Sequence, residues 1–228
     1  MSIIIKKIIP ISLGLLTLFF ADGCRKEFTA TAEHKASYGW ERYELSDYLK
    51  SKEWFANSVS TNEKWKDAYN GLGWSYAKLL ELDSLDTENI GSIRTFHRGL
   101  IQPKDEWNTT DVHLEILAGL AFAYHAKGNN SEVVKFGSAL IDSTLIGLNP
   151  SRWHSWAFSH DSTLNYLDLR VTMASSYFAL AKFDSTHKHL KVVLDSLGAS
   201  NRLISDYSTL LGRQKVAQQL DSLQKVLR

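Results

Sequence analysis

The stretch from Ala68 to Lys78 reads AYNGLGWSYAK, and it decides the fold. Large side chains recur in it and just beyond it at helical spacing, at positions 69, 72, 76, 79 and 80. A glycine inside a helix costs about 1 kcal/mol relative to alanine. Because Gly73 stands inside this pattern, we expect it to mark the point where a second helix approaches closely. Three large side chains should then surround it: Tyr69, Leu72 and Tyr76.

The same arrangement of a small residue within an apolar helical pattern recurs along the chain. The aligned small residues are Gly39, Gly73, Ala121 and Ala174, which are separated by 34, 48 and 53 residues. Tyrosine follows three positions later in the last three copies, and Arg42 takes its place in the first. An acid also stands six positions before each small residue, which predicts negative charge in the first helical turn, where it favours the helix dipole: Glu33, Asp67, Glu115 and Asp168.

This pattern resembles the tetratricopeptide repeat, a helix-turn-helix unit of about 34 residues. The resemblance covers residues 33–197, and it is clearest in the fourth copy. It implies an all-α solenoid of about four degenerate repeats. In the segment 198–228 the apolar spacing predicts an amphipathic helix that caps the stack through Leu210, Leu211, Val216, Leu220, Leu223 and Leu227.

The second and third spacings exceed the repeat length, so extra residues must leave the regular helices. We place the first excess around residues 79–89 and 103–111, and the second within residues 147–166. The second excess is rich in aromatic residues, and it predicts a short β-hairpin whose turn lies near His160 and Asp161.

The composition is that of an ordinary globular protein, with 44% hydrophobic and 22% charged residues. The formal net charge is +1, so no global electrostatic field favours nucleic acid or an anionic surface. The chain has one cysteine, which excludes an internal disulfide and a cysteine-based metal cage.

That cysteine follows a typical export signal. A basic start precedes an apolar run from Ile8 to Ala21, and a small residue stands before Cys24. The apolar run is shorter than the roughly 20 residues of a stable membrane span. The segment resembles a bacterial lipoprotein signal, although Asp22 and Ala21 depart from the usual pattern. The resemblance implies cleavage after residue 23, acylation of Cys24 and a polar tether over residues 24–32. The alternatives are an ordinary signal peptide with a chance cysteine and an uncleaved anchor.

We therefore expect a lipid-anchored protein of the bacterial cell envelope, in the outer membrane, with the leaflet undetermined. The repeat resemblance further implies a groove in which aromatic side chains bind an extended peptide or a helix of a partner protein. The residues at the groove positions are Trp40, Tyr43, Trp74, Phe122, His125 and Phe178. The alternative is that these rings pack between helices and contact no ligand.

No pattern of catalytic or metal-binding residues stands out. The sequence lacks a glycine-rich phosphate loop, a nucleophile elbow and an HExxH motif. The spacing from His154 to His160, like that from His187 to His189, is not suited to one metal ion. We expect no catalysis, no cofactor and no nucleic-acid partner, and we interpret the chain as a scaffold that binds an unidentified protein or peptide.

Two other functions remain open at this point. One is carbohydrate binding at the cell surface, with Trp153 and Trp156 as exposed stacking platforms. The other is assembly of envelope proteins, by similarity to the tetratricopeptide lipoprotein of outer-membrane protein insertion. Asp-Ser followed by Leu or Thr occurs six times and resembles an O-glycosylation acceptor of exported bacterial proteins, for which Ser84, Ser143 and Ser162 are the best candidates.

Overall fold

The computed structural model describes residues 29–82, 90–103, 110–145 and 156–227. All the elements in these ranges belong to one compact unit, Thr31–Arg228. They are helices, apart from one two-stranded sheet, as the sequence pattern predicts. The predicted signal sequence, Cys24 and the first part of the predicted tether lie outside the described residues.

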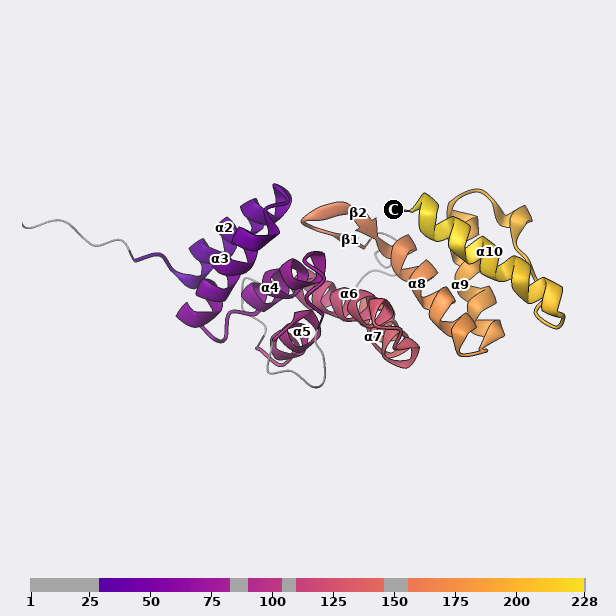
Figure 1. The fold of residues 1–228 in the computed structure, drawn as a ribbon, viewed down its shortest axis with the longest axis horizontal. Helices are drawn as coiled ribbons and strands as arrows, with labels where there is room; N and C mark the ends of the chain where they lie inside the picture. Colours follow the sequence, from indigo (N-terminus) through magenta and orange to yellow (C-terminus); the bar gives the residue numbers. More distant parts are fainter. Residues whose placement is uncertain (1–28, 83–89, 104–109, 146–155, 228) are drawn as a thin grey trace, which may run out of the picture. The chain divides into compact units, whose positions relative to one another are not determined.

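The described helices follow one another as four sequential pairs and one final helix (Figure 1). The pairs are α2 (Ala32–Glu44) with α3 (Tyr48–Thr61), α4 (Lys66–Lys78) with α5 (Ser92–Leu100), α6 (Thr110–Ala126) with α7 (Asn130–Leu145), and α8 (Tyr166–Ala179) with α9 (Phe183–Ser196). Each first helix also contacts the first helix of the next pair. A short 3₁₀ turn, η2 (Ser200–Arg202), leads to α10 (Leu210–Val226), which packs on α8.

Within a pair the two helices run in opposite directions. In three pairs a side-chain hydrogen bond joins the start of the first helix to the end of the second: Ser58 Oγ to the Ala32 carbonyl at 2.6 Å, Lys66 Nζ to the Leu100 carbonyl at 3.3 Å, and Tyr166 Oη to Ser196 Oγ at 3.0 Å. The Lys66 ammonium is buried at the end of α5, where a positive charge also complements the helix dipole.

All four first helices end with the same turn. Seven residues after each aligned small residue the backbone is left-handed: Ser46 (φ 60°), Leu80 (φ 58°), Gly128 (φ 72°) and Ala181 (φ 56°). The residue after each left-handed residue donates its backbone amide to the carbonyl five positions before itself, as in a Schellman cap. The four accepting carbonyls belong to Arg42, Tyr76, Tyr124 and Tyr177. These are the residues three positions after each small residue. The register of the four repeats is therefore confirmed.

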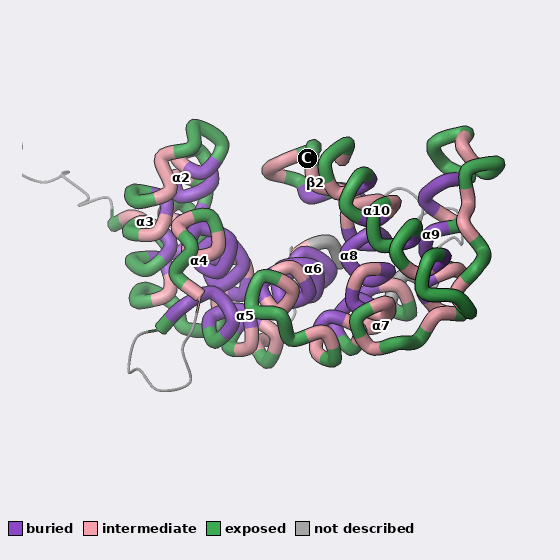
Figure 2. The backbone as a smooth tube through the Cα atoms, turned by 45° about the vertical axis from the view of Figure 1, so that its right-hand side comes forward, coloured by how far each residue is buried: buried purple, intermediate pink, exposed green. Residues whose placement is uncertain are grey.

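The glycines of the opening stretch make room for phenylalanines from the second helices. Phe55 of α3 lies between α2 and α4, and Phe96 of α5 lies between α4 and α6; both are fully buried. A Cβ atom would overlap a phenylalanine ring at four glycines: Gly39 and Gly71 for Phe55, Gly73 and Gly119 for Phe96. The expected close approach at Gly73 is thus confirmed, and α4 is buried over most of its length (Figure 2).

The buried apolar residues form two clusters that share α8. The first cluster reaches from α2 to α8, and the second joins α8, α9 and α10. Val216, Leu220 and Leu223 of α10 pack into the second cluster, as predicted for a cap. The prediction is wrong for Leu210 and Leu211, which are 69% and 61% exposed because the first turn of α10 extends beyond the cluster.

The prediction of an acid in every first turn holds for Glu33, Asp67 and Asp168. It is wrong for Glu115, which is the sixth residue of α6, because this helix begins at Thr110. Glu115 is instead buried, with 2% of its surface exposed.

The expected hairpin is confirmed. Strands β1 (Ala157–Phe158) and β2 (Asp161–Asn165) are antiparallel, with Phe158 paired to Asp161 across a turn at Ser159 and His160. The other extra segments fall mainly on residues 83–89, 104–109 and 146–155, which lie outside the described residues.

Candidate functional site

The hairpin is fixed at its base to the start of α8. Asn165 is the N-cap residue of this helix, and its side chain accepts a hydrogen bond from the Leu167 amide at 2.9 Å. The Asp168 carboxylate accepts from the Asn165 amide at 2.8 Å, which completes a capping box. The base of the hairpin therefore has a defined position, from which its tip reaches the earlier helices.

The tip contacts a surface built from three first helices, which we call the hairpin seat. The seat consists of Trp40 and Tyr43 on α2, Asn70 and Trp74 on α4, and Glu115 on α6. All five side chains are buried. The first helices of the first three pairs therefore hold a tight turn that comes from a later part of the chain.

Phe158 provides the apolar part of this contact. Its ring is 1% exposed and stacks on Trp74, with the ring centroids 4.4 Å apart. It also meets Trp40 and Tyr43 edge-to-face, at 6.0 and 5.9 Å. Burying a phenylalanine contributes about 1.5–3 kcal/mol, and each well-oriented aromatic pair adds about 0.5–1.5 kcal/mol. Phe158 therefore supplies much of the attachment of the tip.

Glu115 provides the polar part. Its carboxylate accepts hydrogen bonds from Asn70 Nδ2 at 2.6 Å, from the Ser159 amide at 3.1 Å and from Ser159 Oγ at 2.6 Å. Burial raises the pKa of Glu115, and the bonds from Ser159 and Asn70 oppose that effect. A buried carboxylate is costly unless donors surround it, so the Ser159 donors compensate part of its desolvation.

Charged groups hold the rim of the same contact. Nδ1 of His160 lies 2.9 Å from Oε1 of Glu44, and the His160 ring stacks on Trp40 with centroids 3.6 Å apart. Lys78 Nζ lies 3.1 Å from an Asp161 carboxylate oxygen. A partly exposed ion pair such as that of Lys78 and Asp161 contributes little, about 0–1 kcal/mol, but together these contacts position the turn.

Two further groups at the contact have shifted pKa values. Burial raises the pKa of Tyr43, so its hydroxyl stays protonated and is a hydrogen-bond donor. For Asp161, burial acts to raise the pKa, but hydrogen bonds from Thr163 and Lys78 outweigh it and lower the pKa. Asp161 is therefore a carboxylate facing the Lys78 ammonium at neutral pH.

Three polar atoms of the hairpin seat are buried without a hydrogen-bond partner among the described residues. They are Tyr43 Oη, Asn70 Oδ1 and Trp74 Nε1. A buried polar group without a partner costs about 1–3 kcal/mol. The hairpin tip thus satisfies Glu115 but leaves two donors and one acceptor of the same surface unsatisfied.

The structure brings three of the predicted groove residues together. Trp40, Tyr43 and Trp74 converge in the hairpin seat, but the hairpin covers their rings, and they are 6%, 3% and 4% exposed. They were expected on an open docking stripe. They are buried because residues 156–165, the excursion before α8, fold back over them.

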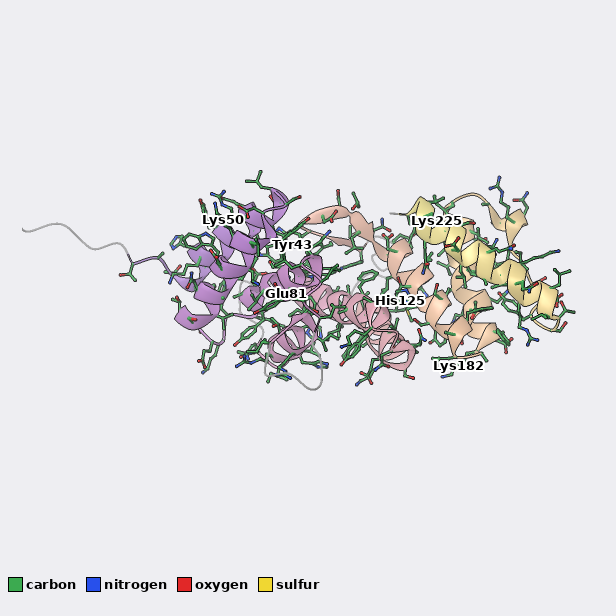
Figure 3. The ribbon with its side chains drawn as sticks, viewed as in Figure 1. Tyr43, Lys50, Glu81, His125, Lys182 and Lys225 are labelled. Carbon is green, nitrogen blue, oxygen red and sulfur yellow. The ribbon has the colours of Figure 1, made fainter. Side chains whose placement is uncertain are left out.

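The other three predicted residues lie elsewhere. Phe122 and His125 of α6 are half-buried and line a cavity of about 220 Å³, together with Leu164 of β2 and Asp168 of α8. Burial lowers the pKa of His125. Phe178 packs in the second apolar cluster, close to Phe183. Figure 3 shows that Tyr43 and His125 belong to different helices. The six residues thus form no single continuous site.

Several residues of the contact were not predicted from sequence. No role was predicted for Asn70 or Ser159, Phe158 was predicted only as one of the aromatic residues of the excursion, and Glu115 was assigned to a helix end. The only available signal was the aromatic content of residues 153–166 and the turn around His160. Trp156, expected as an exposed sugar-stacking platform, is 7% exposed, and Trp153 lies outside the described residues.

We expect Glu115→Gln to change how stability depends on pH. Because the pKa of Glu115 is raised in the folded state, its favourable contribution is complete below the ordinary carboxyl pKa and is lost as the pH rises through the folded pKa. The wild type should therefore lose stability relative to Glu115→Gln as the pH rises above 4.5, as measured by urea unfolding. A constant difference between the two proteins over this range would contradict the raised pKa.

Within the described ranges, no three His, Cys, Asp or Glu side chains gather to hold a metal ion. None of the described helices has the length and apolar composition needed to cross a bilayer. No family model matches the sequence, and no curated protein is significantly similar to it.

Proposed function

We propose that the protein is a lipoprotein of the bacterial cell envelope whose divergent tetratricopeptide repeats act as a non-catalytic scaffold for protein–protein interaction. Cys24 is the lipid attachment site in this proposal, and the outer membrane is the location. The partner is a protein or peptide segment.

The repeat assignment is supported by the regularity of the four helix pairs. The small residue, the residue three positions later and the left-handed residue seven positions later recur in all four first helices. Phe55 and Phe96 also pack in equivalent ways between successive first helices. Repeats of this kind present their first helices to a common binding surface.

The observation that carries the scaffold proposal is the hairpin seat. Side chains of three successive first helices hold a tight turn by ring stacking, by hydrogen bonds to a buried carboxylate and by polar and charged contacts at the rim. Aromatic anchors surrounded by polar contacts are typical of surfaces that recognise peptides. A surface that binds one turn of its own chain has the chemistry to bind a turn of another protein.

We expect Cys24→Ser to release the protein from the membrane. Lipidation adds about 0.8 kcal/mol per buried methylene group, and the near-neutral chain offers no electrostatic substitute. Metabolic labelling with a palmitate analogue should label the wild type and not the variant, and fractionation should place the variant in the soluble or unprocessed fraction. Continued cleavage and membrane attachment of Cys24→Ser would contradict the anchor.

The scaffold role is tested by cross-linking in membranes. A photo-reactive residue at Glu44, exposed at the end of α2 and at the rim of the seat, should capture one or a few defined proteins. The same residue at Asp221, exposed on α10, is the matched control and should not capture them. Equal capture at both positions, or none at Glu44, would contradict the role. Recovery of an outer-membrane barrel protein would favour an assembly function.

A further inference from the structure

We propose that the hairpin seat is a binding site for a tight turn of a partner protein, in which an aromatic residue is followed directly by a serine-like donor and, two residues later, by an acid. The protein's own hairpin occupies this site as an internal ligand, so partner and hairpin compete for it. This inference rests on the proposed scaffold function and names the chemistry of the partner.

The order of groups in the hairpin defines the chemistry of the partner. The Phe158 ring stacks on Trp74. Ser159 donates hydrogen bonds from both its amide and its hydroxyl to the Glu115 carboxylate. Asp161 then meets the Lys78 ammonium. A segment with this order would find the same complementary ring, carboxylate and cation. An aliphatic residue in place of serine would remove the hydroxyl donor to Glu115, and an acidic one would also place a second carboxylate beside it, which provides selectivity.

A partner segment can also satisfy groups that the hairpin leaves without partners. Tyr43 Oη and Trp74 Nε1 are donors, and Asn70 Oδ1 is an acceptor, and none of the three has a hydrogen-bond partner among the described residues. Every residue of a partner carries a backbone carbonyl and, unless it is proline, a backbone amide. A turn that enters the seat more deeply than the hairpin can pair with these atoms, and this gives an external ligand an advantage over the tip of the hairpin.

The hairpin itself is a weakly built element. Strand β1 has only two residues, and the ladder is irregular between Ala157 and Phe158. A two-stranded hairpin is at best marginally stable without other support. On its outer side Ser162 and Thr163 are exposed. The contacts of residues 158–161 with the seat therefore hold it in place, and a ligand that takes over those contacts can displace it.

The test uses a labelled synthetic peptide of residues 156–165, WAFSHDSTLN, and the full-length chain. Phe158→Ala removes the aromatic anchor of the internal hairpin and vacates the seat. Because a tethered segment competes at an effective concentration in the millimolar range, we expect this variant to bind the peptide at least 10-fold more tightly than the wild type. Fluorescence anisotropy measures the affinity, and circular dichroism with thermal unfolding checks that the variant is folded.

Two matched controls isolate the chemistry. A peptide with alanine at the position of Phe158 should bind at least 10-fold more weakly, and Ser162→Ala in the protein should behave like the wild type. If Phe158→Ala does not fold, His160→Ala combined with Asp161→Ala removes only the rim contacts and should still improve peptide binding several-fold. Equal peptide affinity of the wild type and a folded hairpin variant, or equal affinity for both peptides, would overturn the proposal.

The outcome separates this inference from the proposed function. If the peptide fails to bind while a photo-reactive residue at Glu44 still captures a protein in membranes, the scaffold role stands and the competition by the hairpin is wrong. If the peptide binds as expected but the residue at Glu44 captures nothing, the seat is a real binding site and the scaffold role is wrong. Binding of a second copy of the chain would appear as a dimer of Phe158→Ala in light scattering, and this result would also overturn the proposal.

Discussion

Replacing Phe96 with alanine is expected to lower the free energy of unfolding by about 3–5 kcal/mol. The ring is fully buried, meets Trp74 edge-to-face at 5.7 Å, and fills the space between Gly73 on α4 and Gly119 on α6. The two glycines beside the ring have no side chains that could fill the cavity. In thermal unfolding the melting temperature should fall by roughly 10 °C.

The two glycines of the opening stretch give this prediction an internal control. In the wild type, Gly73→Ala and Gly71→Ala should each lower the free energy of unfolding by about 1–3 kcal/mol. The new methyl group overlaps Phe96 in the first variant and Phe55 in the second. In a Phe96→Ala background, Gly73→Ala should become neutral or stabilising by about 1 kcal/mol, since alanine favours the helix and its methyl group enters vacated space. Gly71→Ala should remain costly there. Equal costs of Gly73→Ala in both backgrounds would disprove the packing described for Phe96.

Acidification is expected to destabilise the protein through His189. This imidazole is 6% exposed, and its Nδ1 lies 3.2 Å from Nη1 of Arg170, which donates to it. Burial, followed by the charges of Arg170 and Lys188, lowers the pKa of His189 to about 3. For a base with a lowered pKa, the stabilisation is complete above the ordinary pKa near 6.5 and is lost as the pH falls toward the folded pKa.

Between pH 7 and pH 5, this linkage predicts a loss of about 2 kcal/mol in the free energy of unfolding. His189→Gln keeps an acceptor for Arg170 but cannot ionise, so the difference between variant and wild type should change by that amount over the same range. Urea unfolding at pH 5, 6 and 7 measures it. Ser185→Ala on the same helix serves as the control, and its difference from the wild type should not depend on pH. The same pH independence in His189→Gln would contradict the lowered pKa.

The fold could be predicted because its determinants are local. Gly39, Gly73, Ala121 and Ala174 set a register that the helix ends confirm. The turns were harder to recognise, because only Gly128 supplies the residue type that the left-handed conformation favours. Ser46, Leu80 and Ala181 adopt it at a cost of about 1–2 kcal/mol each, which the packing of each pair must offset.

The candidate site was predicted only in part, because its contacts join residues far apart in the sequence. Trp40, Tyr43 and Trp74 could be aligned as neighbours from the repeat register. The hairpin that covers them could not be predicted to lie there. Its residue His160 is separated from Glu44 by 116 residues, and no periodicity links the two. In the repeat alignment, Glu115 occupies the same position as the first-turn acids. Because α6 already begins at Thr110, Glu115 lies in the middle of the helix and its side chain is buried.

The contact between the hairpin and α2 has a consequence for cooperativity. In a linear array each unit touches only its neighbours, so the end units fray first and unfolding spreads from them. Here the segment before the fourth helix pair is attached to the first pair, across the two pairs between them. This attachment raises the contact order and should slow the final step of folding. The first pair should therefore melt together with α4 and α6 rather than ahead of them.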